Sequence, residues 1–166
     1  MDRLWSPWRL DYIAGPKEKS GCVFCRHAEE TRANPDNPDS LVLATGAHVY
    51  VVLNRYPYNN GHLLVAPLLH RGSLGELSGS DLADPLETVR RVIGVLDRML
   101  RPQGYNVGLN QGKSAGAGLP GHLHWHVVPR WDGDTNFMPV LGQTKVIVES
   151  LHEFYDRLIA ELTLEG

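Results

Sequence analysis

Cysteine is scarce in this sequence. Only 2 of the 166 residues are cysteines, and Cys22 and Cys25 are separated by just two others. A disulfide between such close neighbours closes too small a loop to staple a secreted fold, which favours reduced thiols or metal ligands. A thioredoxin-like redox pair would stand beside a β-α-β pattern, and that pattern is absent. Taken alone, the motif fits a redox pair, a zinc site or two buried thiols.

Long apolar runs and clusters of one charge sign are missing as well. No run approaches the roughly 18 apolar residues of a membrane-spanning helix, and residues 1–9 are too polar for a secretory signal. The 16 Lys and Arg and the 19 Asp and Glu are scattered, with a formal net charge of -3. This argues against a nucleic-acid or membrane surface. We expect a cytoplasmic protein with neither kind of partner.

The chain has the length of one domain, so we expect a single domain over residues 1–166. No internal repeat, low-complexity segment or linker divides it. Residues 1–40 contain four prolines and lack sustained periodicity, and we interpret them as an arm followed by loops. Within them, Leu4, Trp5 and Trp8 form an apolar patch suited to docking.

Hydrophobic periodicity predicts a sheet and two helices. Strands are predicted over residues 41–44, 49–53, 62–67, 105–110 and 123–130, with a short one near Val146. Apolar residues in steps of four and three predict a long helix over 80–102, capped by Ser80 or, because of Pro85, starting later at Asp84. A final helix places Leu151, Phe154, Leu158 and Leu162 on one face. Hairpins with few helices indicate the α+β class with an antiparallel sheet.

Three histidines alternate with apolar residues at the start of the predicted strand 123–130. Successive side chains of a strand point to opposite faces, so His122, His124 and His126 share one face. The apolar residues between them would pack on the other face and hold the strand rigidly. Such backing is what a precise site requires.

Three interpretations of this cluster remain open. The histidines are exposed by chance on a half-buried strand, or His-x-His grips a metal that activates water. The second use needs a carboxylate base, for which the segment offers only Asp132 and Asp134. In the third, neutral imidazole attacks phosphorus and forms a phosphoramidate intermediate. We favour the third.

A glycine-rich loop lies between the last two long strands. A phosphate substrate needs donors around its oxygens, because charge on the leaving group and the transferred group must be stabilised. Asn110, Gln111, Lys113, Ser114 and the backbone of residues 112–121 can provide them. The alternative is a flexible connection without such a role.

These residues resemble the histidine-triad (HIT) family, whose signature alternates three histidines with hydrophobic residues. Residues 54–57 (Asn-Arg-Tyr-Pro), leading to 61–67 (Gly-His-Leu-Leu-Val-Ala-Pro), are similar to its upstream ribose-binding and histidine segments. Residues 4–9, 106–110 and 127–131 further resemble the branch with bacterial diadenosine tetraphosphate phosphorylases. The resemblance covers most of the chain. It implies an α+β fold with an antiparallel sheet of about five strands, a long central helix and a C-terminal helix.

The resemblance also implies roles for the histidines. His124 would be the nucleophile, and His126 and His62 would assist at the phosphates and the leaving group. His122 would orient the strand or bind a metal.

The nucleotide pocket follows from the same resemblance. Asn54 would accept the ribose hydroxyls, Leu53 and its apolar neighbours would form the base pocket, and Asn110 would contact phosphate. Trp131 would stack on a base or line the product site, unless it simply packs after the strand. Many relatives carry Ser or Thr where this chain has residues 118–121 (Gly-Leu-Pro-Gly). Ser114 or Lys113 would have to supply the missing phosphate contact.

Zinc-bearing relatives in the HIT family join such cysteines to two histidines. One follows the Gly-His strand and the other is the first of the triad, which here match His70 and His122. The resemblance therefore implies a structural zinc site at Cys22, Cys25, His70 and His122. Four ligands close a tetrahedral zinc, so this metal would steady the histidine strand rather than activate water.

The implied reaction is attack by His124 on the α-phosphate of a nucleotide, with phosphate or water resolving the covalent intermediate. We predict cleavage of dinucleoside polyphosphates of the diadenosine tetraphosphate type, leaning to phosphorolysis, with an adenine nucleotide as substrate. No catalytic metal or organic cofactor is expected. The resemblance further implies a homodimer whose sheet continues across the interface. The alternatives are a purine nucleoside phosphoramidate hydrolase and a sensor that binds nucleotide without a covalent step.

Overall fold

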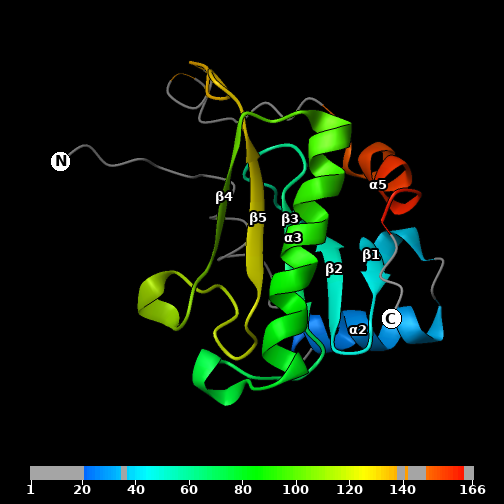
Figure 1. Ribbon diagram of the computed structural model, residues 1–166, viewed down its shortest axis with the longest axis vertical. Coiled ribbons are helices and arrows are strands. Elements are labelled where there is room, and N and C mark those ends of the chain that lie inside the picture. Colours follow the sequence, from blue (N-terminus) through cyan, green and yellow to red (C-terminus); the bar gives the residue numbers. More distant parts are fainter. Residues whose placement is uncertain (1–20, 35–36, 138–140, 142–148, 163–166) are drawn as a thin grey trace.

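The computed structural model describes residues 21–34, 37–137, 141 and 149–162. Five strands form one antiparallel sheet in the order β1-β2-β3-β5-β4 (Figure 1). They are β1 (Val42–Thr45), β2 (Val49–Leu53), β3 (Leu63–Pro67), β4 (Gly104–Leu109) and β5 (Trp125–Arg130). The predicted α+β class and five-stranded sheet are confirmed. The expected patch at Leu4, Trp5 and Trp8 and the strand near Val146 lie outside the described residues.

The long helix α3 (Ser80–Leu100) crosses one face of the sheet and contacts β2, β3 and β5 (Figure 1). The predicted helix is confirmed. Val89 and Leu96 of its predicted apolar face are buried, but Leu86 is 53% exposed, and the buried face includes Val92 instead. The predicted caps are wrong. The N-cap is Gly79, whose carbonyl accepts the first helical bonds, so Ser80 is already helical. The helix then continues through Pro85, and Asp84 does not start it.

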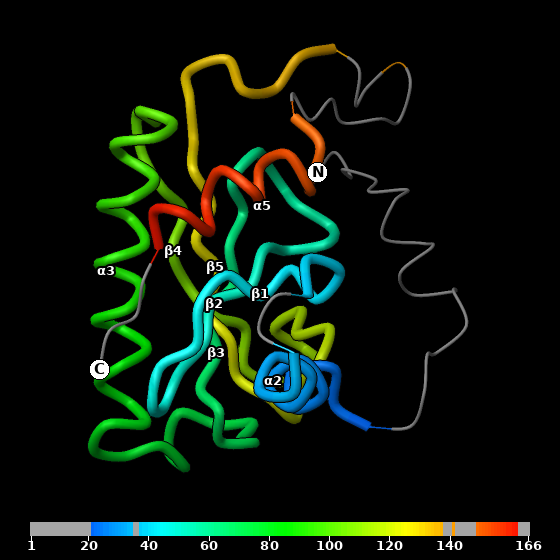
Figure 2. Tube along the Cα trace, turned by 90° about the vertical axis from the view of Figure 1, so that its right-hand side faces the viewer, coloured from blue at the N-terminus to red at the C-terminus, as the bar shows by residue number. Residues whose placement is uncertain are grey.

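Helix α2 (Val23–Ala33) corrects the interpretation of residues 1–40 as arm and loops. Its buried residues are Phe24, Ala28 and Thr31, a stripe at helical spacing only one residue wide. One member is a threonine, and no side chain caps the helix, so the sequence signal is weak. Figure 2 shows α2 on the side of the sheet opposite α3. The sheet is therefore covered on both faces.

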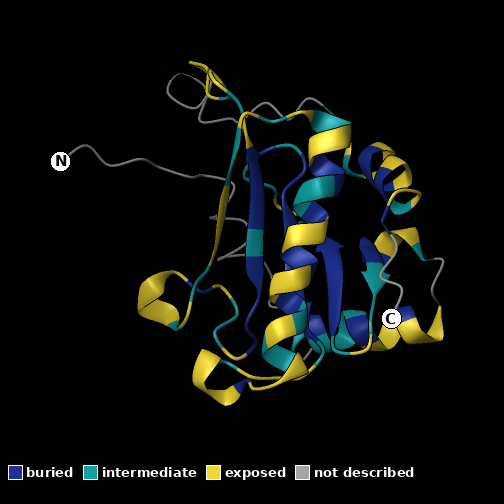
Figure 3. Ribbon diagram, in the orientation of Figure 1, coloured by how far each residue is buried: buried dark blue, intermediate teal, exposed yellow. Residues whose placement is uncertain are grey.

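Helix α5 (Leu151–Ile159) packs on β1, and Ser150 caps it by accepting a bond from the Glu153 amide. It buries Phe154 and Leu158 as predicted, whereas Leu162 is buried beyond its end. Strands β2 and β3 are buried along their whole length (Figure 3). Short 3-10 helices occupy Pro38–Ser40 (η1), Leu74–Glu76 (η2) and Lys113–Ala115 (η3). Among the described residues, no helix is long and apolar enough to cross a membrane.

Candidate active site and metal site

The histidine segment runs into β5 from its N-terminal side. Leu123, Trp125 and Val127 are buried at 2%, 5% and 0% exposure, as alternation predicts. Only the His126 end of the histidine face reaches solvent. His122 and His124 are just 1% and 7% exposed. The strand begins at Trp125 rather than at residue 123.

Hydrogen bonds to carbonyl oxygens determine which nitrogen of His122 and His124 carries its proton. A carbonyl can only accept, so the ring nitrogen beside it must be the donor. His122 Nε2 lies 2.8 Å from the Pro67 oxygen, which leaves the Nδ1 lone pair free. His124 Nδ1 lies 2.9 Å from the His122 oxygen, which leaves the Nε2 lone pair free. His122 therefore presents Nδ1 as a ligand atom, and His124 presents Nε2 as a nucleophile.

His62 and His126 are joined by a hydrogen bond whose direction is also determined. The Tyr58 amide donates to His62 Nδ1 at 3.0 Å, and Asn54 Nδ2 lies 3.2 Å from the same nitrogen. His62 must then carry its proton on Nε2, which donates to His126 Nδ1 at 2.9 Å. His126 in turn carries its proton on Nε2. The pair thus supplies an N–H donor beside the nucleophile.

Burial keeps the inner imidazoles neutral. The pKa of His62 is lowered to about 3, first by burial and then by the charges that His126 and His124 would carry. Burial also lowers the pKa of His124, although its hydrogen bond with the His122 carbonyl acts in the opposite direction. The ring of Phe24 on α2 covers His124 at a centroid distance of 4.6 Å. A neutral imidazole has the free lone pair that nucleophilic attack requires.

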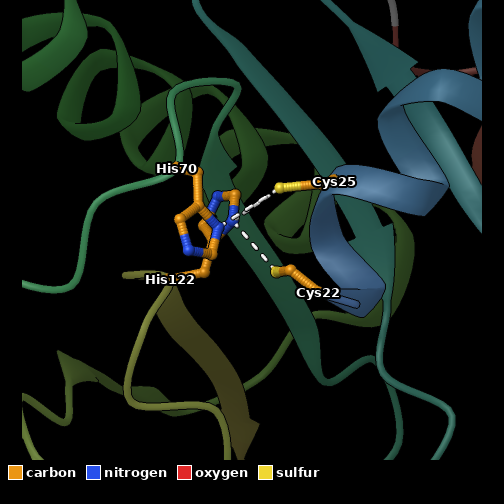
Figure 4. A group of neighbouring side chains, drawn as sticks. All are labelled: Cys22, Cys25, His70 and His122. Carbon is orange, nitrogen blue, oxygen red and sulfur yellow. Dashed lines mark hydrogen bonds between the residues drawn. The ribbon is translucent and has the colours of Figure 1, made fainter. Parts of the chain in front are cut away.

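Cys22, Cys25, His70 and His122 converge at the start of α2 (Figure 4). Their ligand atoms all lie within 4.8 Å of one another. Cys22 Sγ is 3.3 Å from His122 Nδ1, and Cys25 Sγ is 3.3 Å from His70 Nδ1 and 3.6 Å from His122 Nδ1. Zinc bonds of about 2.0–2.3 Å place tetrahedral ligands roughly 3.3–3.8 Å apart. The predicted ligand set therefore comes together as one group that can bind a metal ion.

The two thiols of this cluster differ in acidity. Burial raises the pKa of Cys22, but the hydrogen bond with His122 and the adjacent backbone amides outweigh it and lower the value to about 6. Burial and the neighbouring Cys22 raise the pKa of Cys25 to about 11. A divalent cation between the sulfurs would favour deprotonation of both.

The predicted nucleotide-binding residues are dispersed around the histidines. Asn54 contacts His62, and Leu53 is buried at the end of β2. Asn110 lines a groove with His126. Three others lie differently: Gln111 accepts a bond from the Leu74 amide, Ser114 is exposed on η3, and Trp131 is half-buried after β5. Their contacts with a nucleotide stay predictions.

Sequence reasoning missed an anchor beyond the triad. The Asp134 side chain is only 7% exposed, and it binds Arg130 through both carboxylate oxygens. Asn59 Nδ2 also donates to Asp134 at 2.9 Å. The β2–β3 loop, which carries Tyr58, is thereby fastened to the end of β5. Only the spacing of four residues between Arg130 and Asp134 hinted at this pair.

The fold and the site define an α+β protein in which a buried histidine with a free Nε2 lone pair lies beside a hydrogen-bonded histidine pair. A HIT domain is recognised over residues 34–133. The AP-4-A phosphorylase of Mycobacterium tuberculosis is 42% identical over 156 residues, which cover 92% of this chain and 80% of that protein. This chain therefore belongs to the HIT family.

Solved structures agree with this assignment. A Zn-bound histidine triad family protein from Mycobacterium smegmatis superposes with a TM-score of 0.64 and 26% identity, over 84% of this chain and 90% of that one. A hypothetical histidine triad nucleotide-binding protein from Sulfolobus tokodaii gives a TM-score of 0.61, also at 26% identity, over 84% and 87% of the two chains. The fold is thus shared with HIT proteins of both bacteria and archaea.

Proposed function

We propose that the chain cleaves dinucleoside polyphosphates of the diadenosine tetraphosphate type by transferring a nucleotidyl group to His124. The observation that carries this proposal is the proton arrangement of His124. Its Nδ1–H is held by the His122 carbonyl, so Nε2 offers its lone pair. The relative named AP-4-A phosphorylase, 42% identical over 92% of the chain, supports the substrate class.

In the first step His124 Nε2 attacks the α-phosphorus. A P–N bond forms while the P–O bond to the leaving nucleotide breaks, and the electron pair of that bond stays on the departing oxygen. His126 Nε2–H donates a hydrogen bond to this oxygen as its negative charge grows. His62, neutral and buried, holds His126 in that orientation.

In the second step inorganic phosphate attacks the same phosphorus and the P–N bond breaks. His124 recovers its lone pair, and diadenosine tetraphosphate has become ADP and ATP. Water in place of phosphate would yield AMP and ATP. We propose phosphate as the preferred acceptor because of the similarity to a phosphorylase.

Zinc is the metal that the donor set of the cluster fits, since two sulfurs and two imidazoles are its usual structural ligands. Cys22, Cys25, His70 and His122 would hold it in a closed site, where it supplies cross-linking between α2 and the histidine segment. The chemistry at His124 needs no open metal position.

We also propose that the described elements act as one domain and that the protein is a homodimer joined through β4. Strand β4 is an outer strand of the sheet, and Val107 at its middle is 46% exposed. The other outer strand, β1, is contacted by α2 and α5. A second copy would extend the sheet at β4.

The test is product analysis with diadenosine tetraphosphate, with and without inorganic phosphate, for the parent and His124→Asn. ADP plus ATP should form only with phosphate and disappear in the variant. A nucleotidyl adduct on the parent should be visible by intact-protein mass spectrometry. His48→Asn is the matched control, because His48 pairs with Asp81 away from the site and should keep full activity.

Other outcomes decide against parts of the proposal. AMP plus ATP without phosphate would make the enzyme a hydrolase. Cleavage of adenosine 5′-phosphoramidate alone would move the substrate to phosphoramidates. Nucleotide binding without an adduct or turnover would support the alternative of a nucleotide-binding sensor.

A further inference from the structure

A groove of about 520 Å³ opens beside His126, within the range of roughly 300–1,000 Å³ that ligand sites occupy. It is lined by residues of β4, β5 and the β2–β3 loop. It follows β5 past His126 to Val128 and Arg130, away from His122 and the cysteines. Of its lining, the proposed chemistry uses the His126 ring and the Tyr58 amide that orients His62, and Asn110 is expected to contact phosphate.

The far end of this groove holds a fixed guanidinium. Arg130 Nη2 donates to Asp134 Oδ1 at 2.9 Å, and Nη1 donates to Asn106 Oδ1 at 2.6 Å. With the bond from Nε to Asp134, three of the five N–H donors of the guanidinium are used. Two donors therefore remain for a ligand, on a side chain that is 46% exposed. A pre-positioned arginine suits a phosphate group.

The middle of the groove is open because position 108 has no side chain. Gly108 is paired directly with His126, and a Cβ built there would meet nothing within 4 Å. Alternate residues of a strand share a face, so the amides of Asn106 and Asn110 flank this gap on the side of His126. A chain of phosphates passing the His126 N–H would find neutral and cationic donors along its way.

We propose that the groove binds the leaving half of the substrate, namely the polyphosphate and nucleoside that depart when His124 takes the nucleotidyl group. This inference rests on the proposed function. A dinucleoside polyphosphate has two nucleosides, and Asn54 and Leu53 are expected to hold only one of them. The leaving group departs beside the His126 donor, which is where the groove begins.

Two variants test this by different means. Gly108→Val fills the gap with a residue favoured in strands. Position 108 is exposed in a single copy, so the core is not disturbed, and the β4 backbone groups that would pair with a second copy are kept. Asn106→Asp keeps the acceptor oxygen for Arg130 but adds a negative charge that repels polyphosphate. Asn37→Asp is the matched control, since it adds the same charge at the cap of η1 and keeps the bond from the Asp39 amide.

Each variant is assayed with diadenosine tetraphosphate and with adenosine 5′-phosphoramidate, which donates the same adenylyl group but has no second nucleoside. We expect the ratio of the two kcat/KM values to fall at least about 10-fold in Gly108→Val and Asn106→Asp, since one phosphate contact with a charged group is worth roughly this factor. Asn37→Asp should keep the parent ratio. An unchanged ratio in both groove variants would overturn the proposal.

A binding measurement separates this inference from the proposed function. In the His124→Asn background, calorimetry compares the Kd of diadenosine tetraphosphate with that of AMP, which lacks the leaving half. The groove variants should raise the Kd of diadenosine tetraphosphate at least about 10-fold more than they raise the Kd of AMP. If the parent turns over neither substrate, the proposed function fails, and this Kd ratio still decides the role of the groove. Equal weakening of both ligands would count against the groove.

Discussion

His122 and His126 are four residues apart, share one face of the chain and both carry their proton on Nε2, yet they turn opposite nitrogens toward the site. His122 donates from Nε2 to the Pro67 carbonyl and turns Nδ1 toward the cysteines. His126 accepts at Nδ1 from His62 and presents Nε2–H to the groove. The same side chain is thus placed to serve as a metal ligand at one end and as a hydrogen-bond donor at the other. The hydrogen-bond partner of each ring, the Pro67 carbonyl for His122 and His62 for His126, decides which nitrogen is turned outward.

The two ends also differ in what covers them. His122 lies against α2, where Phe24 contacts it at a ring centroid distance of 5.2 Å, and is almost fully buried. His126 is half-exposed and borders open space. A closed metal site requires the first environment, whereas a leaving group requires the second. The segment between them places His124 at the boundary.

The largest effect on turnover is expected from removing the contact that orients His126. His62→Ala removes the donor that fixes His126, and turnover should fall by about 100-fold, the lower range for acid–base assistance. His62→Gln keeps an N–H donor and should recover part of the loss. Steady-state kinetics measures this, with metal content by elemental analysis expected to be unchanged in both variants.

His48→Ala provides the matched control for the histidine substitution, because His48 bonds Asp81 at the surface. It should keep the parent kcat. If His62→Ala also kept the parent kcat, the direction assigned to the His62–His126 bond would have no catalytic consequence.

Removing a metal ligand at the His122 site should lower the free energy of unfolding more than it lowers kcat. Cys25→Ser removes one of the four ligands, and metal content should drop. The cross-link between α2 and the histidine segment would then be lost. A loss of about 3–4 kcal/mol corresponds to a Tm lower by roughly 10 °C for a chain of this length.

Differential scanning calorimetry with a chelator completes the test. The chelator should lower the Tm of the parent to that of Cys25→Ser and leave the variant unaffected. A parent whose Tm ignores the chelator would show that the cluster does not stabilise the fold through a metal.

The smallest expected effect is a loss of stability at acidic pH. His62 has a pKa of about 3 when folded and an ordinary value of 6.5 when unfolded, so below pH 6.5 the unfolded chain binds a proton that the folded one excludes. Stability therefore falls as pH drops from about 6.5 toward 3, by at most about 1.4 kcal/mol per pH unit from this group. Urea unfolding between pH 7 and 4.5 measures the slope.

The control for this slope is His62→Gln, whose side chain does not titrate. The metal ligands are common to parent and variant, so the difference between their slopes isolates His62. Parallel slopes would contradict a neutral, buried His62.

Periodicity predicted the elements that alternate or repeat strongly. Strand β2 matches its prediction over residues 49–53, and α3 lies where the apolar steps predicted a long helix. Helix α2 escaped because three buried positions, one of them Thr31, are too few to reveal a period. Leu41 was assigned to a strand, but its φ of 58° closes η1 instead. A left-handed backbone at leucine is unfavourable by itself and is held by surrounding contacts, so the sequence alone does not predict it.

The sequence by itself determined which chemistry-bearing residues this protein has and that three histidines share a face, because alternation is a local property of a strand. It also pointed to four metal ligands, through resemblance to a family. Only the tertiary structure decided which nitrogen each imidazole exposes. That choice depends on the Pro67 carbonyl for His122, the His122 carbonyl for His124 and the His62 ring for His126. The first and the last of these partners lie 55 and 64 residues from the ring they contact. Tautomers follow hydrogen-bond partners, and partners distant in sequence are fixed by packing.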